Sequence, residues 1–298
     1  MKPIISANAI EARAEFEELV KNIRPELHRY ASRMVGSAID GEDVVQETLA
    51  KAYYALATLS PDANLRGWLF RIAHNKAIDF LRGRKNQLFE QIDDFPPVSQ
   101  PDFPLEKKEL AAIALSVFIR LVPSQRSCVI LKDVLDYSLA EISEILNRSV
   151  PEIKAVLHRG RARLRELAAA PPAGDKFVFS KEKKDLLDRY VELFNARDFD
   201  GVRELLADEA RLDLVGRARL SGATQIQTKY FGNYAAKTDW RFARGAVENK
   251  PAILVYDPQE NRDAPDYFIL LETEENKVTH IRDFRYAKYV IEGAAVAG

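Results

Sequence analysis

The sequence has little that could form a disulfide bond or a metal site. It contains one cysteine, Cys128, so an internal disulfide is excluded. Its four histidines, His28, His74, His158 and His280, are too scattered for the ligand spacing of a zinc site. Cys128 lies in the apolar run CVIL, where we expect a small buried hydrophobic side chain. The sequence therefore predicts neither a metal nor a cofactor.

Long apolar runs are also missing. No window of about 18 apolar residues occurs, which is the length that a membrane-spanning helix needs. The first residues, MKPIISANAIEARAEFEELV, have no apolar core followed by a small-residue cleavage site. We therefore expect a cytoplasmic protein that does not interact with a membrane.

The charge is nearly balanced overall but unevenly distributed. The 298 residues are 47% hydrophobic, which is enough for two or three domains with cores of their own, and the net charge is −1. Residues 66–85 hold six Lys or Arg and one acidic residue, and so do residues 148–165. Basic charge thus gathers in two patches within an otherwise acidic chain.

The second basic patch lies in a predicted helix-turn-helix, residues 138–165. Ser138 with Glu141 and Ser149 with Glu152 have the S-x-x-E spacing of a capping box, and the turn falls at Asn147-Arg148. In the second helix we expect a core face with a basic flank beside it. The core face comprises Ile153, Leu157, Gly160 and Leu164, and the flank comprises Lys154, His158, Arg161 and Arg165. Helical hairpins are common and charge runs are usually solvated, so this segment alone does not establish DNA binding.

The first basic patch follows an amphipathic helix. Residues 40–56, DGEDVVQETLAKAYYAL, bury one stripe and leave an acidic face with Asp43, Glu47 and Tyr54, and with Gln46 on its flank. Residues 64–86, NLRGWLFRIAHNKAIDFLRGRKN, form a second predicted helix. Its outer face carries Arg71, Asn75, Ile78 and Arg82. Cationic and amide side chains near aromatic rings suit single-stranded or melted nucleic acid, although Trp68 and Phe70 could equally be core residues.

Two boundaries divide the chain. Residues 91–108 form an acidic, proline-rich linker, and residues 169–180 form a second one. Between them, residues 109–168 are predicted to be helical, with helices over 105–122 and 124–135 before the helix-turn-helix. The N-terminal helical domain covers residues 8–90, and the C-terminal domain covers residues 181–291.

The C-terminal domain is predicted to be α+β, because helical patterns give way to short β-like runs. A further helix is expected over 223–236. The predicted strands, which we expect to form an antiparallel sheet, cover 210–216, 240–248, 251–257, 266–274 and 277–290.

Residues 8–168 resemble the extracytoplasmic-function sigma factors of bacterial RNA polymerase. Residues 40–56 resemble region 2.2, and residues 64–86 resemble regions 2.3 and 2.4. The segment LVPSQRSCVILKDVLDYSLAEISEILNRSVPEIKAVLHRGRARLREL resembles region 4, including Pro123, Gln125 and Arg126. The fold class implied is two all-α domains, with the helix-turn-helix in the second.

The resemblance implies partners for the outer faces. Asp43, Gln46 and Glu47 would contact the clamp helices of the largest subunit of core RNA polymerase, and region 4 the flap region. The −10 element of promoter DNA would be read by Arg71, Asn75, Asp79 and Arg82, with the loop 60–65 near an extruded base. The −35 element would be read by Ser149, Lys154, His158, Arg159 and Arg161. Ala155 and Val156 stand where many family members have serine and arginine, which leaves fewer side chains for base contacts.

Residues 181–291 resemble a SnoaL-like domain of the NTF2-like superfamily, a cone of curved sheet backed by helices. The resemblance rests on YVELFNARDFDGVRELLADEARLDLVG and HIRDFRYAKYV. Such domains include cyclases and isomerases with a pocket carboxylate, for which Asp213, Asp257 and Asp283 are candidates. We expect at most a ligand pocket, with Tyr190, Asp213 and Trp240, and no catalysis.

The sequence thus predicts an alternative sigma factor that is regulated in cis by docking of its C-terminal domain on the sigma domains. Two alternatives remain. One is a ligand-responsive helix-turn-helix regulator that works without polymerase, for which the 64–86 block would have no use. The other is a cyclase-like enzyme in the C-terminal domain.

Overall fold

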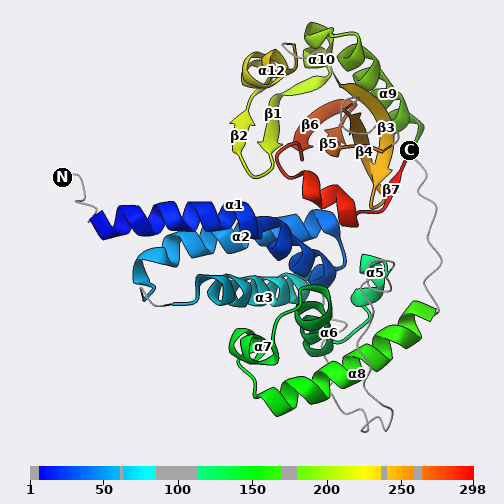
Figure 1. Cartoon of the computed structure of the whole chain (residues 1–298). Coiled ribbons are helices and arrows are strands. Elements are labelled where there is room, and N and C mark those ends of the chain that lie inside the picture. The colour runs from blue at the N-terminus through cyan, green and yellow to red at the C-terminus, as the bar shows by residue number, and fades with distance from the viewer. Residues whose placement is uncertain (1–6, 61–62, 85–112, 170–179, 236–239, 258–263) are drawn as a thin grey trace. The chain divides into compact units, whose positions relative to one another are not determined.

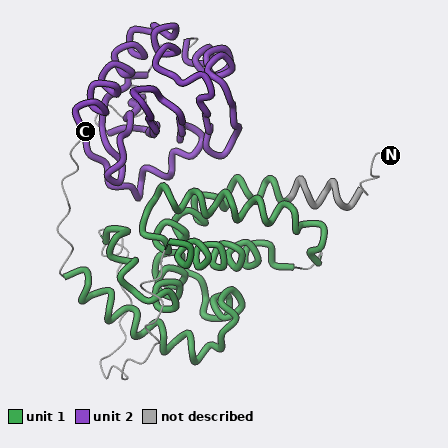
Figure 2. The backbone as a smooth tube through the Cα atoms, turned by 180° about the vertical axis from the view of Figure 1, so that it is seen from behind, with its two compact units in different colours: residues 1–173 green, residues 174–298 purple. Residues whose placement is uncertain are grey.

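The computed structural model describes residues 7–60, 63–84, 113–169, 180–235, 240–257 and 264–298, with side chains from residue 16 onward. The chain divides into two compact units, residues 1–173 (unit 1) and 174–298 (unit 2), as Figure 2 shows. The predicted linker 91–108 and most of 169–180 lie outside the described residues.

Unit 1 begins with three long helices that lie side by side (Figure 1). They are α1 (Ala7–Val35), α2 (Ala38–Ala55) and α3 (Leu65–Arg84), with the short 3-10 turn η1 (Leu56–Thr58) after α2. Ser37 caps α2 by accepting a hydrogen bond from the backbone N–H of Asp40. A Cβ at Gly41 would lie 2.6 Å from the backbone of Ser32, so this glycine allows α2 to approach α1 closely.

The second half of unit 1 contains the predicted helix-turn-helix. Its elements are α5 (Leu115–Phe118), α6 (Pro123–Val129), the π turn η2 (Ile130–Val134), α7 (Leu139–Leu146) and α8 (Val150–Ala169). Both capping boxes are confirmed, because Ser138 and Ser149 each exchange hydrogen bonds with the glutamate three residues later. Asn147 ends α7 in the left-handed conformation at φ 52°, so the turn also lies where it was predicted.

One helix prediction was too long. Within the described part of the segment 105–122, only Leu115–Phe118 is helical. Ala114 is extended at ψ 147°, and Val122 is extended at ψ 148° directly before Pro123. The residue before a proline is driven out of the helical region by the proline ring, and the periodic pattern does not reveal this.

The two halves of unit 1 share a single hydrophobic core. Arg126, in α6, is buried at the junction and donates hydrogen bonds to three backbone oxygens. Its acceptors are Met34 at the end of α1, Ile119 (2.8 Å) and Leu121 (2.7 Å). Burial lowers the pKa of Arg126 to about 10, so it remains charged at neutral pH.

A second junction lies at Tyr137, between η2 and α7. Its ring packs on Phe70 of α3 at 5.1 Å, and Phe70 in turn packs on Tyr30 of α1 at 5.6 Å. Arg66 of α3 donates a 2.8 Å hydrogen bond to the Tyr137 hydroxyl and also pairs with Glu26. Aromatic contacts and a charged hydrogen bond thus fix α7 against α3.

Unit 2 is a curved seven-stranded sheet with helices packed against one face (Figure 1). Its helical elements are α9 (Lys181–Asn195), α10 (Phe199–Glu204), α11 (Ala223–Ile226), η3 (Gln227–Phe231), α12 (Gly232–Ala235) and η4 (Lys288–Gly293). Its strands are β1 (Leu206–Leu214), β2 (Ala218–Ser221), β3 (Arg241–Val247), β4 (Lys250–Tyr256), β5 (Tyr267–Glu274), β6 (Lys277–Asp283) and β7 (Val296–Ala297). Their order in the sheet is β2-β1-β6-β5-β4-β3-β7.

The α+β class is confirmed, but three details of the predicted sheet were wrong. β1 pairs with β6 in parallel, so the sheet is mixed and not antiparallel. β2 and β7 were not predicted, because four and two residues are too short to show alternation. The last strand ends at Asp283 and not at residue 290, since the chain turns at residues 284–287 into η4.

The partly buried histidine His74 makes the stability of unit 1 depend on pH. His74 Nδ1 lies 2.8 Å from the Tyr30 hydroxyl, and burial, followed by the positive charge of Arg148, lowers the pKa of His74 to about 4. The unfolded chain takes up this proton near pH 6.5, whereas the folded chain does not until pH 4. The stabilisation is therefore complete above pH 6.5 and is lost as the pH falls towards 4.

We predict that His74 alone removes about 2 kcal/mol from the free energy of unfolding of unit 1 between pH 7 and pH 5. Urea denaturation of a Trp240→Phe background, in which Trp68 is the only tryptophan, measures this free energy at each pH. The variant His74→Asn should show a shallower pH dependence by that amount. An unchanged slope in the variant would contradict the assignment.

Candidate nucleic-acid and partner surfaces

The acidic face predicted on α2 lies at the surface of unit 1. Glu47 is exposed and pairs with Lys76 of α3 at 2.9 Å, while Asp43 and Gln46 are half-buried. Tyr54 continues the same face, seven residues after Glu47, and is 85% exposed. An exposed aromatic ring next to carboxylates can act as an anchor in a protein interface.

All four predicted DNA contacts on the outer face of α3 are exposed, and one of them is engaged by another helix. Asn75, Asp79 and Arg82 are exposed, and Asp79 lies 3.7 Å from Arg82 in an ion pair that solvent screens. Arg71 is exposed too, but its guanidinium donates a hydrogen bond to the backbone oxygen of Glu144 in α7. The basic face of α3 is therefore partly occupied by the helix-turn-helix.

A pocket of about 330 Å³ lies where α3 meets α7. One wall comes from the loop before α3 and from α3 itself, with Asn64, Trp68 and Arg71 among its residues. The other wall comes from Glu144 and Ile145 of α7. The loop predicted to lie near an extruded base thus borders a pocket that α7 covers.

The exposed surface of α8 differs from the predicted one at Val156 and Arg161, which are both buried. The cap residue Ser149, Lys154 and Ala155 are exposed. Val150, His158 and Arg159 are half-buried. Val156 is buried, so its departure from the family pattern does not change the exposed face.

Arg161 was assigned to the −35 surface, and the structure corrects this. Its side chain is 6% exposed and forms two hydrogen bonds to Asp133 of η2, at 2.9 and 2.6 Å. This bidentate ion pair holds α8 on η2, so the guanidinium is not available to a phosphate. The helical spacing predicted the side of α8 on which Arg161 lies. It did not reveal the carboxylate partner, Asp133, which is 28 residues away in the sequence.

The interior of unit 2 contains a buried carboxylate, Asp283 at the end of β6. One oxygen accepts hydrogen bonds from Tyr230 (2.7 Å) and Tyr234 (3.0 Å), and the other accepts one from the backbone N–H of Arg285 (2.8 Å). The Tyr234 hydroxyl also bonds to that of Tyr267 at 2.8 Å. Burial raises the pKa of Asp283, while these hydrogen bonds oppose the shift.

The predicted pocket trio is only partly brought together. Tyr190 and Trp240 both contact Phe194 in the interior, with ring centroids at 5.7 and 5.2 Å. Asp213 instead lies outside, 3.2 Å from Arg219 and 3.3 Å from His280. The alternation of side chains along a strand could have shown this. Asp213 lies between Leu212 and Leu214 and is therefore on the opposite face from them, whereas Asp283 is on the same face as Ile281.

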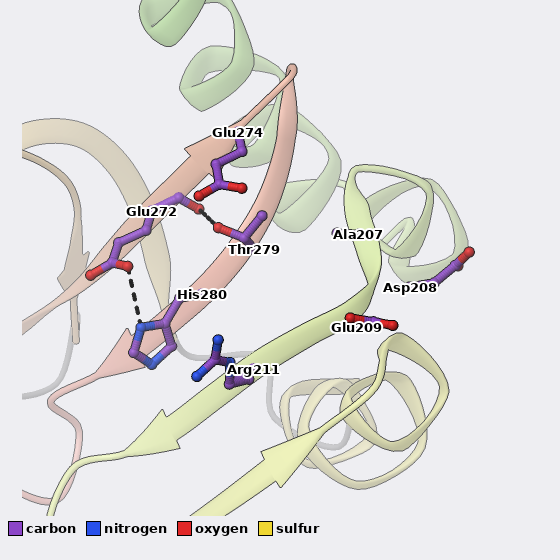
Figure 3. Close-up of a pocket in the computed structure, with 8 residues that line it drawn as sticks. All are labelled: Ala207, Asp208, Glu209, Arg211, Glu272, Glu274, Thr279 and His280. Carbon is purple, nitrogen blue, oxygen red and sulfur yellow. Dashed lines mark hydrogen bonds and ion pairs between the residues drawn. The ribbon is translucent and has the colours of Figure 1, made fainter.

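His280 also lines a polar surface pocket of about 500 Å³ on β1, β5 and β6, shown in Figure 3. Its Nδ1 lies 3.5 Å from Glu272, and Glu209, Glu274 and Arg211 lie around the same hollow (Figure 3). Within the described part of the chain, no group of three or more His, Cys, Asp or Glu could hold a metal ion. No helix among those residues is long and apolar enough to cross a membrane.

Comparison with known proteins identifies both halves of unit 1. Residues 19–87 match the family model for sigma-70 region 2, and residues 115–164 match the model for sigma-70 region 4. The chain is 31% identical over 156 residues to the RNA polymerase sigma-E factor of Streptomyces coelicolor, an alignment that covers 51% of this chain and 85% of the relative.

Other similarities extend into unit 2. The chain is 28% identical over 307 residues to the ECF RNA polymerase sigma factor SigG of Mycobacterium tuberculosis, covering 93% of this chain and 82% of the relative. Among solved structures, an NTF-2 like protein of Burkholderia xenovorans is similar at 19% identity and a TM-score of 0.30, covering 34% of this chain and 80% of that protein. The second unit is an α+β domain. The chain as a whole belongs to the extracytoplasmic-function sigma factors of the sigma-70 family.

Proposed function

We propose that this sigma factor binds core RNA polymerase through α2 and directs it to promoters through α3 and α8. The observation that carries the proposal is the basic and amide face of α3 together with the basic face of α8, in segments that match sigma-70 regions 2 and 4. A regulator with only a helix-turn-helix has no use for the first of these faces. We propose no reaction for unit 2, because both oxygens of its interior carboxylate, Asp283, are engaged by donors.

We propose that Asp43, Gln46 and Glu47 of α2 bind core polymerase by contacting the clamp helices of its largest subunit. Tyr54 extends this surface as an exposed aromatic anchor. The flap region would contact the segment that resembles region 4. The Glu47–Lys76 pair is exposed on the Glu47 side, so its opening would cost little.

For promoter DNA we propose that Arg71, Asn75, Asp79 and Arg82 bind the −10 element, and that Ser149, Lys154, His158 and Arg159 bind the −35 element. Lys154 is the exposed basic residue nearest the N-terminal end of α8, the end that enters the major groove in helix-turn-helix proteins. Arg161 instead holds α8 in position through Asp133.

We predict that Lys154→Ala weakens binding to the specific −35 sequence by ~1–3 kcal/mol, because a lysine at a base edge discriminates by that amount. Binding of full-length holoenzyme to promoter DNA, with specific and scrambled −35 sequences, measures the effect. Arg163→Ala, an exposed change further along α8, is the matched control and should leave the specificity ratio unchanged. Equal losses of Lys154→Ala on both DNAs would contradict the base contact.

The packed state of unit 1 restricts access to the −10 surface. Arg71 is bonded to α7, and α7 forms one wall of the pocket beside the 63–64 loop. We propose that promoter recognition requires α7 to leave α3, which separates the two halves at Tyr137. The closed state would then lower the affinity of the free protein for DNA by the free energy of opening.

We predict that Tyr137→Ala increases the affinity of the full-length protein for single-stranded −10 DNA, since it removes the contacts to Phe70 and Arg66 that hold α7 on α3. Each 1.4 kcal/mol lost from the closed state raises the open fraction about tenfold. Fluorescence anisotropy measures the affinity, and circular dichroism verifies that the helices persist. Tyr286→Ala, at an exposed tyrosine of unit 2, is the control. Unchanged affinity with intact helices would contradict closure.

We further propose that unit 2 regulates the sigma domains in cis by docking on them. The two units have separate cores and share one chain, so unit 2 acts at a fixed, high effective concentration without needing a second protein.

We predict that deleting the residues from about 177 onward changes run-off transcription with core enzyme by about fivefold or more, the lower range of a typical coupling between sites. A genomic promoter library identifies the cognate promoters in the same assay. Equal transcription by the full-length and truncated proteins would argue against control in cis. Absence of promoter-specific transcripts with both proteins would instead contradict the sigma function itself.

A further inference from the structure

One end of the sheet in unit 2 is rich in arginine. β2, β1 and β6 lie side by side there (Figure 1). The segments 211–219 and 280–286, which hold the end of β1, the start of β2 and the end of β6, contain five arginines. Of their two aspartates, Asp283 is fully buried, so only Asp213 reaches solvent. Unit 2 as a whole holds slightly more acidic than basic residues, so this excess of positive charge is local.

The register of the strands places three charged side chains in one row. Asp213 of β1 is the partner of Arg219 in β2 and of Arg282 in β6, so two arginines stand on either side of one carboxylate. Leu212 is buried in the core, so the row lies on the face away from the helices. The Arg219 side chain is 78% exposed and lies 3.2 Å from Asp213. Such an exposed ion pair is weak, so Arg219 can exchange Asp213 for another anion at little cost.

Arg217 extends the row through the turn between β1 and β2. Its guanidinium lies over the ring of Tyr286, 4.6 Å from the centroid, and it pairs with no carboxylate of the described residues. A guanidinium stacked on a ring keeps its N–H donors and has already lost part of its side-chain freedom. Arg217 is therefore preorganised for an anion with several oxygens, such as a phosphate. We call Arg217, Arg219 and Arg282 the arginine row.

The arginine row suits a polyanion better than a single anion. β2 and β6 are two strands apart, about 10 Å, so Arg219 and Arg282 reach different negative charges. A nucleic-acid backbone offers them, with one phosphate for every ~3.4 Å of helix axis on each strand of duplex DNA. Arginines on the face of a sheet reach phosphates without entering a groove, so such a contact is independent of the base sequence.

We propose that the arginine row binds phosphates of the duplex DNA upstream of the −35 element in the promoter complex. The inference rests on the proposed function of α8, which places unit 2 near that DNA. α8 ends at Ala169 and α9 begins at Lys181, and the residues between them span at most about 40 Å. One turn of DNA is about 35 Å long, so unit 2 is tethered within about a turn of the −35 element. The downstream side is occupied by α3 and polymerase, which leaves the upstream duplex.

The test measures the affinity of full-length holoenzyme for two forms of a cognate promoter. One form ends at the −35 element, and the other continues upstream for ~20 bp of random sequence, about two turns of DNA. Polymerase itself can contact upstream DNA, so the quantity compared between proteins is the gain in affinity from the added duplex. Arg217→Ala/Arg219→Ala should reduce this gain about fivefold or more, because two exposed charge contacts are lost. On the long DNA alone it should also lower the slope of log affinity against log salt by about 2.

Two further variants separate charge from other effects. Arg241→Ala is the matched control, because Arg241 of β3 is also exposed and lies over a tyrosine ring, that of Tyr256, at 4.4 Å. It should leave the gain unchanged. Arg217→Lys/Arg219→Lys keeps both charges and should retain most of the gain.

Three results would overturn the proposal and leave the proposed function intact. The first is a gain that is absent in the wild type or unchanged in the alanine variant. The second is an equal loss of affinity on both DNAs, which would assign the arginine row to the sigma domains or polymerase. The third is a loss in the lysine variant as large as in the alanine variant, since a phosphate contact depends on charge. If wild-type holoenzyme does not distinguish the promoter from DNA with a scrambled −35 element, the proposed function fails, and this inference fails with it.

Discussion

The buried guanidinium of Arg126 is the interaction on which the arrangement of unit 1 depends. It gathers backbone oxygens from the end of α1 and from the turn at Ile119 and Leu121, none of which could be left unpaired in a core at low cost. The charge is held by three carbonyls in place of a carboxylate. Removing it would leave three buried acceptors, so α6 and the end of α1 are fixed as one piece.

The other features of unit 1 follow from this junction. With α6 fixed on α1, the chain leaving η2 brings Tyr137 onto Phe70 and Arg66 of α3. That contact places α7 beside α3, where the backbone of Glu144 accepts the hydrogen bond of Arg71. The same packing that stabilises the unit therefore covers part of the surface proposed to bind the −10 element. His74 of α3, whose pKa is lowered by burial and which lies 2.8 Å from the Tyr30 hydroxyl of α1, makes unit 1 sensitive to acid.

The sequence predicted those features that arise within one helix or one strand. Capping boxes at Ser138 and Ser149, and the turn at Asn147, depend on residues three to five positions apart, and all were confirmed. Arg161 and Asp213 were misassigned because their partners, Asp133 and Arg219 with His280, come from other elements. The parallel pairing of β1 with β6 was missed for the same reason, since alternation gives the faces of a strand but not its neighbours.

In unit 2 the interior combines a satisfied acid with unsatisfied donors. Asp283 is held by three hydrogen bonds, whereas Tyr190 and Trp240 have none from the described residues. Packing alone does not call for such donors, because phenylalanine would fill the space of Tyr190 without the cost of a buried hydroxyl.

The separation of the two halves of unit 1 is the central claim, and the distance between them tests it most directly. Spin labels at Lys21→Cys in α1 and Arg163→Cys in α8, in a Cys128→Ser background, report this distance by pulsed electron resonance; both positions are exposed. The account predicts one short distance in the free protein and a longer one when core polymerase and promoter DNA are added. The same short distance in the promoter complex would contradict it.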